Sequence, residues 1–293
     1  MTDSLPCRVH GDGEPTLVYL PGLHGDWTLL GPFRQALGSR ARLVEFAYPR
    51  RTGWSLEDYA RYVADALLSR ELQNVWLLGE SFSSQVAWAL VRLLLESEVT
   101  GTKKTLHFSG LILVGGFVKH PWPWGVWLAH RASASAPHWL LKRACHAYGS
   151  FAQRRHASST SMCDEFREFV ERRLAPGDRE AVTSRYHLIA DNDLRPVALR
   201  TTLPVFHLSG GIDPIVPWWH VRPWLRRHCP GFRESRILHR AGHNVLLDAP
   251  EESAEQILEW VARSERSAGQ EVARCPASTA GADGANAPAR NRD

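Results

Sequence analysis

Residues 74–98 read "NVWLLGESFSSQVAWALVRLLLESE", and this stretch decides the fold. It begins with a short and almost continuous apolar run from Val75 to Leu78, which is typical of a strand covered on both faces, as in a parallel sheet. Its second half is apolar nearly all round a helical projection, which indicates a buried helix. Gly79 lies between the two, two residues before Ser81. The pattern therefore predicts a serine exposed on a sharp strand-to-helix turn.

Further apolar runs bounded by turn residues predict other strands. The predicted strands occupy residues 16–20, 42–46, 74–78, 110–115, 204–208 and 236–239. Residues 55–69 place apolar side chains at helical spacing, and Ser55 with Asp58 three residues later predicts an N-terminal capping box. Strands that alternate with helices predict an α/β fold, with a mostly parallel central sheet flanked by helices.

The alternation stops between residues 117 and 200. Helical patterns rich in tryptophan, without a convincing strand, occupy residues 117–200, so we predict a helical cap inserted between two strands. A long aromatic pair of crossover helices is the simpler alternative. The α/β core then comprises residues 1–116 and 201–262. Residues 263–293 contain too few large apolar side chains to offset the entropy of ordering, and we predict that they form a disordered tail.

The composition indicates a globular protein with no strong preference for polyanions. Its formal charge is +4, and its 35 basic residues are scattered rather than aligned along one face, so we expect no nucleic-acid partner. The five cysteines form no CxxC pair, which suits a reducing compartment. No signal peptide is visible, and no apolar run approaches the roughly 18 to 20 residues that cross a bilayer. We therefore expect a cytoplasmic, soluble protein without a membrane span. The oligomeric state stays open.

Two loops that follow later strands carry an acid and a histidine, in an order that suits Ser81. "SGGIDPIVP" (209–217) contains Asp213, and "RAGHNVLLDAPEE" (240–252) contains His243. The carboxyl ends of parallel strands meet at one edge of the sheet, so the three side chains could converge there. A serine hydroxyl needs a base to take its proton and an acid to orient that base. Taken alone, Asp213 could be a turn residue and His243 a packed one; their joint order favours a triad.

A glycine-bearing turn after the first strong strand completes the predicted site. "VYLPGLHGDW" (18–27) would present the backbone N–H of Leu23 opposite that of Phe82, so that both stabilise an oxyanion. We interpret His24 as a loop residue. No cofactor or metal is expected, because no HExxH, GxGxxG or Walker pattern is present.

Four motifs together resemble those of α/β-hydrolase-fold serine hydrolases: "LPGLHGD", "LLGESFSS", "LSGGIDPIVP" and "AGHNVLLDAPEE". The resemblance covers about residues 12–262. It implies an esterase-like enzyme whose site comprises the nucleophile Ser81, the general base and acid His243, the orienting acid Asp213, and the oxyanion N–H groups of Leu23 and Phe82.

Two positions depart from the family pattern. Ser83, followed by Ser84, stands where relatives have a small glycine pair. A serine hydroxyl can bond a nearby carbonyl, so we expect the turn to form nonetheless. Glu80 places an acid beside the nucleophile, either as a solvated or salt-bridged carboxylate or as a modulator of the field at the site.

The resemblance implies that a carboxylic ester or a thioester is hydrolysed through an acyl-enzyme on Ser81, as in carboxylesterases. The tryptophan-rich cap indicates a small apolar or aromatic substrate, although tryptophan suits a plain core equally well. Trp122, Trp124 and Trp127 are therefore candidate pocket residues. A non-catalytic ligand-binding protein and an acyltransferase on the same fold stay open as alternatives.

Overall fold

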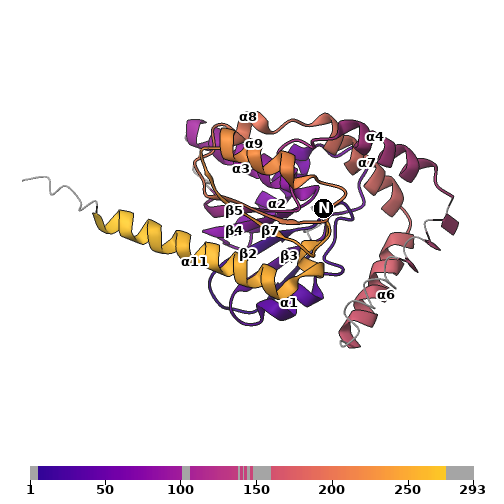
Figure 1. Ribbon diagram of the computed structural model, residues 1–293, viewed down its shortest axis with the longest axis horizontal. Helices are drawn as coiled ribbons and strands as arrows, with labels where there is room; N and C mark the ends of the chain where they lie inside the picture. Colours follow the sequence, from indigo (N-terminus) through magenta and orange to yellow (C-terminus); the bar gives the residue numbers. More distant parts are fainter. Residues whose placement is uncertain are drawn as a thin grey trace, which may run out of the picture.

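The computed structural model describes residues 6–100, 106–137, 139, 140, 142, 143, 146, 147 and 160–274. A seven-stranded sheet forms its centre, in the order β1-β3-β2-β4-β5-β6-β7 (Figure 1). Every neighbouring pair is parallel except β1 and β3, which are antiparallel. The strands are β1 (Cys7–His10), β2 (Thr16–Leu20), β3 (Arg42–Phe46), β4 (Val75–Glu80), β5 (Phe108–Val114), β6 (Val205–Gly210) and β7 (Phe232–Leu238). This confirms the predicted α/β fold with a mostly parallel sheet.

Helices cover both faces of the sheet and make two apolar layers. One layer contains α2 (Leu56–Leu68), α3 (Ser83–Thr100) and α9 (Trp218–His228); the other contains α1 (Gly31–Leu37), α10 (Val245–Asp248) and α11 (Pro250–Arg274). Successive side chains of a strand point to opposite faces. In β4, Val75 and Leu77 therefore face the α2–α3 layer, whereas Trp76 and Leu78 face the α1–α11 layer. Burial on both sides explains why the central strands are continuously apolar.

The predicted capping box at the start of α2 is present. The hydroxyl of Ser55 accepts from the N–H of Asp58 at 3.2 Å, and the Asp58 carboxylate accepts from the N–H of Ser55 at 2.8 Å. Two donors at the helix N-terminus are thereby satisfied.

The segment between β5 and β6, which we call the insertion, is helical wherever it is described. It contains α4 (Pro123–Ser135), α6 (Thr160–Leu174), α7 (Asp178–Asp191) and α8 (Arg195–Ala198). Figure 1 shows α4 and α7 lying together beyond the end of the sheet, with α6 running down beside the core. Within the helical region predicted at 117–200, the pattern "CDEFREFVERRL" (163–174) falls within α6, whereas the pattern "HWLLKRACHAY" (138–148) lies partly outside the described residues. Among the described helices, none combines the length and apolar character that a membrane crossing needs.

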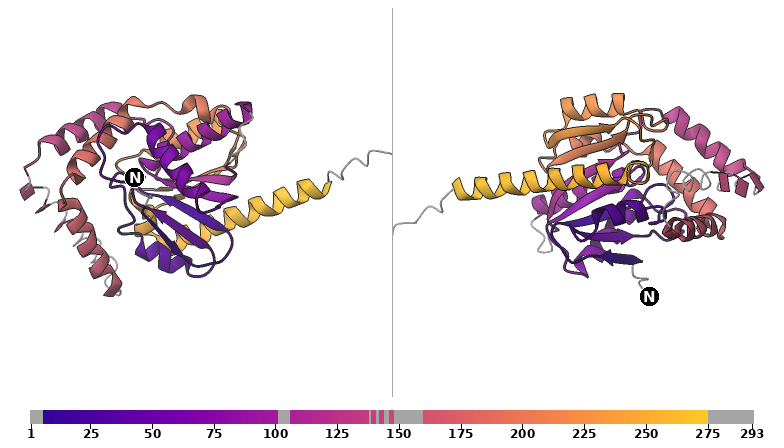
Figure 2. Two further views of the ribbon diagram at one scale, coloured as in Figure 1. Left: turned by 180° about the vertical axis from the view of Figure 1, so that it is seen from behind. Right: turned by 60° about the horizontal axis from the view of Figure 1, so that its bottom comes forward.

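Two features at the ends of the chain differ from the sequence-based expectation. Strand β1 was not predicted; it pairs with β3 at the edge of the sheet. The predicted start of a disordered tail at residue 263 is wrong, because α11 continues to Arg274 and projects from the body (Figure 2). Within this extension Arg263 pairs with Glu259, four residues earlier, and with Glu234 on β7. Residues 275–293 lie outside the described part of the chain.

Candidate active site

Ser81 occupies a tight turn between β4 and α3, with a φ of 48°. This left-handed backbone conformation is uncommon for a residue with a side chain and is found where a turn is over-determined by its surroundings. The Ser81 N–H donates to the carbonyl of Val114 at 2.9 Å, which ties the turn to β5. Glycine is required two residues earlier, because a Cβ on Gly79 would lie 2.9 Å from the carbonyl oxygen of Ser83.

Two hydrogen bonds connect the three residues that the sequence predicted as a triad. His243 Nε2 lies 2.9 Å from Ser81 Oγ, and His243 Nδ1 lies 2.8 Å from Asp213 Oδ2. Asp213 is only 2 % exposed, and its other oxygen accepts from the N–H groups of Ile215 at 2.8 Å and Val216 at 3.0 Å. These backbone bonds fix the carboxylate in the orientation that faces the imidazole.

The histidine loop is fitted against β5 at Gly115. This residue has a φ of 52°, and a Cβ on it would lie 3.0 Å from the His243 carbonyl oxygen and 3.4 Å from His243 Nδ1. Any side chain at Gly115 would therefore press on the imidazole that bridges Ser81 and Asp213.

The two serines that replace the usual glycine pair are fully buried and hydrogen-bonded. Ser83 Oγ donates to the carbonyl of Pro21 and lies 2.8 Å from the hydroxyl of Tyr48. Ser84 Oγ donates to the carbonyl of Ser81 at 2.6 Å. The expectation that these hydroxyls bond nearby carbonyls is confirmed. The sequence did not predict that Ser83 joins the nucleophile turn to the loop after β2.

That loop passes beside Ser81. A Cβ on Gly22 would lie 3.7 Å from Ser81 Cβ, and the next residue, Leu23, lines the same cavity as Ser81 and His243. Phe82 is buried at the start of α3. Leu23 thus lines the same cavity as Ser81, and Phe82 directly follows the serine; that their N–H groups bind an oxyanion stays a prediction.

Glu80 is not the solvated or salt-bridged carboxylate that was the first of the two expectations for it. It lines the cavity and accepts a hydrogen bond from Tyr19, and within the described residues it forms no ion pair with Lys or Arg. Burial raises the pKa of the Glu80 carboxyl, against smaller opposing effects of Tyr19, His243 and the N–H of Gly22. Glu80 is therefore a cavity-wall group beside the imidazole.

A cavity of about 650 Å³ opens from Ser81 between the core and the insertion. Its walls are mainly apolar, with contributions from Leu29, Phe117, Val126, Phe169, Ile189 and Leu247. Trp122 and Trp124 line it, as predicted for pocket residues. Trp127 does not, because it lies on the outer face of α4 and is 59 % exposed.

His120 is a cavity residue that sequence reasoning missed. Its Nδ1 accepts from the N–H of Trp122 at 3.2 Å, and its ring packs edge-on against Phe117. Burial, reinforced by the neighbouring His243, lowers the pKa of His120 to about 4. Its position just after β5 is the same strand-end signal that identified Asp213 and His243, and could have revealed it.

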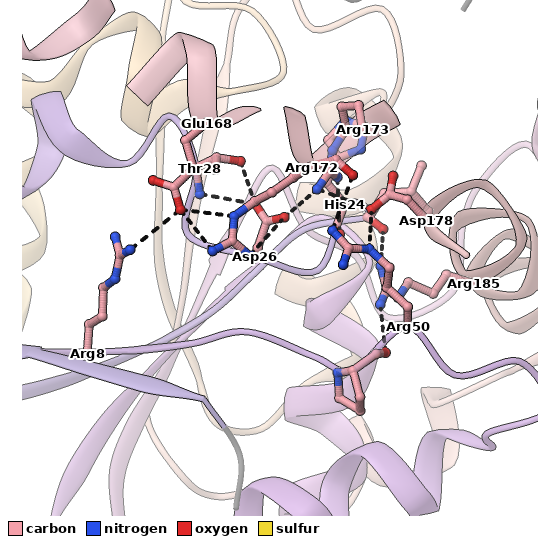
Figure 3. Close-up of polar contacts among 12 residues, drawn as sticks. Arg8, His24, Asp26, Thr28, Arg50, Glu168, Arg172, Arg173, Asp178 and Arg185 are labelled. Carbon is pink, nitrogen blue, oxygen red and sulfur yellow. Dashed lines mark hydrogen bonds and ion pairs between the residues drawn. The ribbon is translucent and has the colours of Figure 1, made fainter. Parts of the chain in front are cut away.

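Arginines of the insertion hold the loop after β2 (Figure 3). Arg173 of α6 pairs with Asp26 and, at 3.3 Å, with Asp178; it also donates to the carbonyl of His24 at 3.2 Å. Burial acts to raise the pKa of Asp26, but Arg173 and the Thr28 hydroxyl outweigh it and the pKa is lowered. His24 is thus a loop residue, as expected, whose carbonyl anchors the insertion.

Comparisons with known proteins show which family and which solved structures this chain resembles. A model of the alpha/beta hydrolase family matches residues 9–256. A solved esterase from Exiguobacterium antarcticum is 17% identical, with a TM-score of 0.67 over 88% of this chain and 95% of that one. An enol-lactonase from Burkholderia xenovorans LB400 is 16% identical, with a TM-score of 0.65 over 88% and 96%. A bromoperoxidase from Bacillus anthracis is 14% identical, with a TM-score of 0.65 over 87% and 94%. Among curated proteins, no sequence match was found.

Proposed function

The chain belongs to the α/β hydrolase family, and on that premise we propose that it is a serine hydrolase that cleaves a carboxylic ester or thioester of a small apolar substrate. The observation that carries this proposal is the hydrogen-bond chain from Asp213 through His243 to Ser81, at 2.8 and 2.9 Å. In such a chain the imidazole takes the serine proton while the carboxylate orients the ring and stabilises its charged form.

Acylation begins when Ser81 Oγ attacks the substrate carbonyl carbon and His243 Nε2 takes the hydroxyl proton. The carbonyl electron pair moves onto oxygen, which faces the N–H groups of Leu23 and Phe82. In other enzymes, loss of one such donor costs about 3–4 kcal/mol of transition-state stabilisation. The oxyanion then collapses, the bond to the leaving group breaks, and the departing alcohol or thiol takes the proton from His243.

Deacylation repeats these steps with water. His243 removes a proton from the water as its oxygen attacks the acyl carbon, and the bond between that carbon and Ser81 Oγ breaks. The serine oxygen takes the proton back, and the carboxylic acid leaves. One water is consumed, and one acid and one alcohol or thiol are produced.

The cavity supports an uncharged, apolar substrate. Among the described residues that line it there is no Lys or Arg, whereas Asp26 and Glu80 contribute acidic groups. An anionic substrate would therefore find no Lys or Arg in the described cavity lining to compensate its charge, and its desolvation would be unfavourable. A neutral acyl group can instead bury its carbon skeleton against the apolar walls.

Hydrolysis of a panel of p-nitrophenyl esters by the full chain tests the proposal. We expect turnover by the unmodified protein and a loss of at least about a thousandfold in Ser81→Ala. Ser135→Ala, which changes an exposed serine on α4, is the matched control and should keep its activity. Full activity in Ser81→Ala would refute the mechanism. Absence of turnover with retained ligand binding would favour a binding protein, and ester products formed with an added alcohol would favour an acyltransferase.

A further inference from the structure

Helix α4 turns its apolar stripe outward. Trp124, Trp127, Leu128 and Arg131 follow one another at i, i+3, i+4 and i+7, so they share one face of the helix. Such a stripe normally faces a core, yet Trp124 is 68 % exposed, Trp127 59 % and Leu128 56 %. The opposite side carries the buried Val126, which packs towards the core.

A second group of tryptophans continues this stripe onto α9. Trp122 stacks with Trp124 at 6.4 Å between ring centroids, and its other side meets Trp219 of α9, also at 6.4 Å. Trp219 is 47 % exposed. Figure 1 places α4 and α9 along the same upper side of the molecule, with α9 over one face of the sheet. We call the exposed set Trp124, Trp127, Leu128 and Trp219 the tryptophan patch.

The tryptophan patch borders the cavity. Trp122 and Trp124 belong both to the cavity lining and to the aromatic cluster, and the neighbouring Ile215 lines the cavity while half exposed. The patch is therefore continuous with the cavity lining through Trp124.

The elements that carry the patch contain basic and no acidic side chains. Helix α4 carries Arg131, helix α9 carries Arg222, Arg226 and Arg227, and neither helix contains an Asp or Glu. Arg131 lies over the ring of Trp127 at 5.5 Å. On α9, Arg222 and Arg226 follow Trp219 at i+3 and i+7, on its exposed face. Neither Arg131 nor Arg222 pairs with a carboxylate among the described residues.

We propose that the tryptophan patch docks the protein on the surface of an anionic lipid bilayer. Exposed Trp and Leu on one helix face, flanked by Arg, are the groups that partition into the interface between headgroups and acyl chains. The arginines beside them are attracted to anionic headgroups. A protein docked in this way lies on the membrane surface and needs no membrane-spanning helix.

The charge on the patch selects a lipid surface over a second copy of the chain. Two copies that met through α4 and α9 would oppose arginine to arginine, because neither helix carries an acidic residue. An anionic bilayer offers the complementary charge together with an apolar phase for the indoles. Lipid-dissolved esters would then reach the cavity from the bilayer; this consequence rests on the proposed hydrolase function, whereas docking does not.

Co-sedimentation of the full chain with vesicles tests the docking. We use phosphatidylcholine vesicles with and without about one third phosphatidylglycerol, and expect binding to the anionic vesicles to be at least about tenfold stronger and to weaken with added salt. The double variant Trp127→Ser/Leu128→Ser should lose about tenfold or more of this binding. Arg131→Glu with Arg222→Glu should abolish the preference for anionic vesicles. Circular dichroism and thermal midpoints check that each variant is folded.

Matched controls separate the patch from the rest of the surface. Val9→Ser removes an apolar side chain of similar exposure, 55 %, on edge strand β1, and Arg266→Glu reverses an exposed charge on α11; both should bind as the parent does. Equal binding by the parent and the patch variants would overturn the proposal. So would a concentration-dependent dimer that only the patch variants lose, since it would assign the patch to a second copy. Ser81→Ala should still bind vesicles, so a failure of the hydrolase proposal would leave this result unchanged.

Discussion

Arg185 Nη1 on helix α7 donates a hydrogen bond to the carbonyl oxygen of Leu23 at 2.9 Å. The side chain is 1 % exposed, and its other polar partners are the hydroxyl of Tyr59 and the carbonyl of Pro49. Within the described residues it pairs with no carboxylate. Gly25 is needed opposite it, because a Cβ there would overlap the guanidinium. A buried cation held by carbonyls fixes the backbone that supplies them.

Arg185 is therefore expected to position the Leu23 loop for the proposed oxyanion. Arg185→Met keeps much of the side-chain volume but removes the donors, and we predict that kcat for a short-chain ester falls about tenfold while KM changes little, a fraction of the loss of a full oxyanion donor. Arg185→Lys should restore part of kcat. Steady-state kinetics on variants whose thermal midpoints are also measured provide the check.

Arg179→Met is the control for this experiment. Arg179 lies on the same helix and also donates to two backbone carbonyls, those of Ser133 and Ala134 in α4, away from the Leu23 loop. Its replacement should lower stability without changing kcat. If both variants lower the thermal midpoint equally and neither changes kcat, Arg185 has only a structural role.

We expect Ser83 to stabilise the folded state of this chain more than a glycine at the same position would. Ser83→Gly removes partners of the Tyr48 hydroxyl and the Pro21 carbonyl, both buried, so we predict a loss of roughly 1–3 kcal/mol in the free energy of unfolding. Adding Tyr48→Phe to Ser83→Gly removes the Tyr48 hydroxyl that the first substitution leaves without its partner. The double variant should therefore lose less unfolding free energy than the two single variants lose in sum. Urea unfolding of the four proteins measures the coupling; strict additivity would show that the bond contributes nothing.

His207 should make the protein less stable at acidic pH. It is fully buried on β6 with Nδ1 2.9 Å from Ser235 Oγ, and burial, reinforced by Arg222, lowers its pKa from 6.5 to about 4. Between these values the unfolded chain binds a proton that the folded chain does not, so stability falls as pH falls from 6.5 to 4, by up to about 3 kcal/mol.

His207→Leu should flatten this part of the stability curve, as measured by urea unfolding at several pH values. The exposed His228 on α9 provides the control, because His228→Gln should leave the slope unchanged. An unchanged slope in His207→Leu would assign the acid sensitivity to other groups.

Glu80 should have the opposite effect on the pH dependence. Burial raises the pKa of its carboxyl, so the folded chain keeps a proton that the unfolded chain has released. Stability therefore falls as pH rises from the ordinary glutamic acid pKa to the raised one, and it stays lower above it. Glu80→Gln keeps an acceptor for Tyr19 and should raise the thermal midpoint at pH 7 relative to the parent, with a smaller gain at pH 4. Glu255→Gln, at an exposed position on α11, should show no such difference.

The core strands and the three predicted catalytic residues were readable from sequence because each depends on local pattern. A parallel strand buried on both faces is continuously apolar, and Ser81 and Asp213 follow two such strands, β4 and β6. His243 follows β7, an edge strand of mixed sequence that was recognised only by its short apolar end. Strand β1 carried no such signal. It lies at the edge of the sheet, its four residues are partly buried or exposed, and it exists through its pairing with β3.

The anchoring of the insertion was not predictable in the same way. Arg173 and Asp26 lie 147 residues apart, and neither is distinguished from other charged residues by its neighbours in the sequence. Trp127 was expected in the pocket only because it lies in the tryptophan-rich segment predicted as the cap. Its sequence spacing shows which side chains share its face of α4 but not where that face points. Whether that face points inward depends on packing against α7, which the sequence pattern does not contain.

Labelling of the full chain with a fluorophosphonate, followed by mass-spectrometric mapping, tests the central claim most directly. A fluorophosphonate reacts with a serine whose hydroxyl is activated by a base and whose developing oxyanion is stabilised. We predict a single modified residue, Ser81, with labelling abolished in Ser81→Ala and strongly slowed in His243→Ala. Modification of another serine, or no modification of a folded protein, would contradict the proposed mechanism.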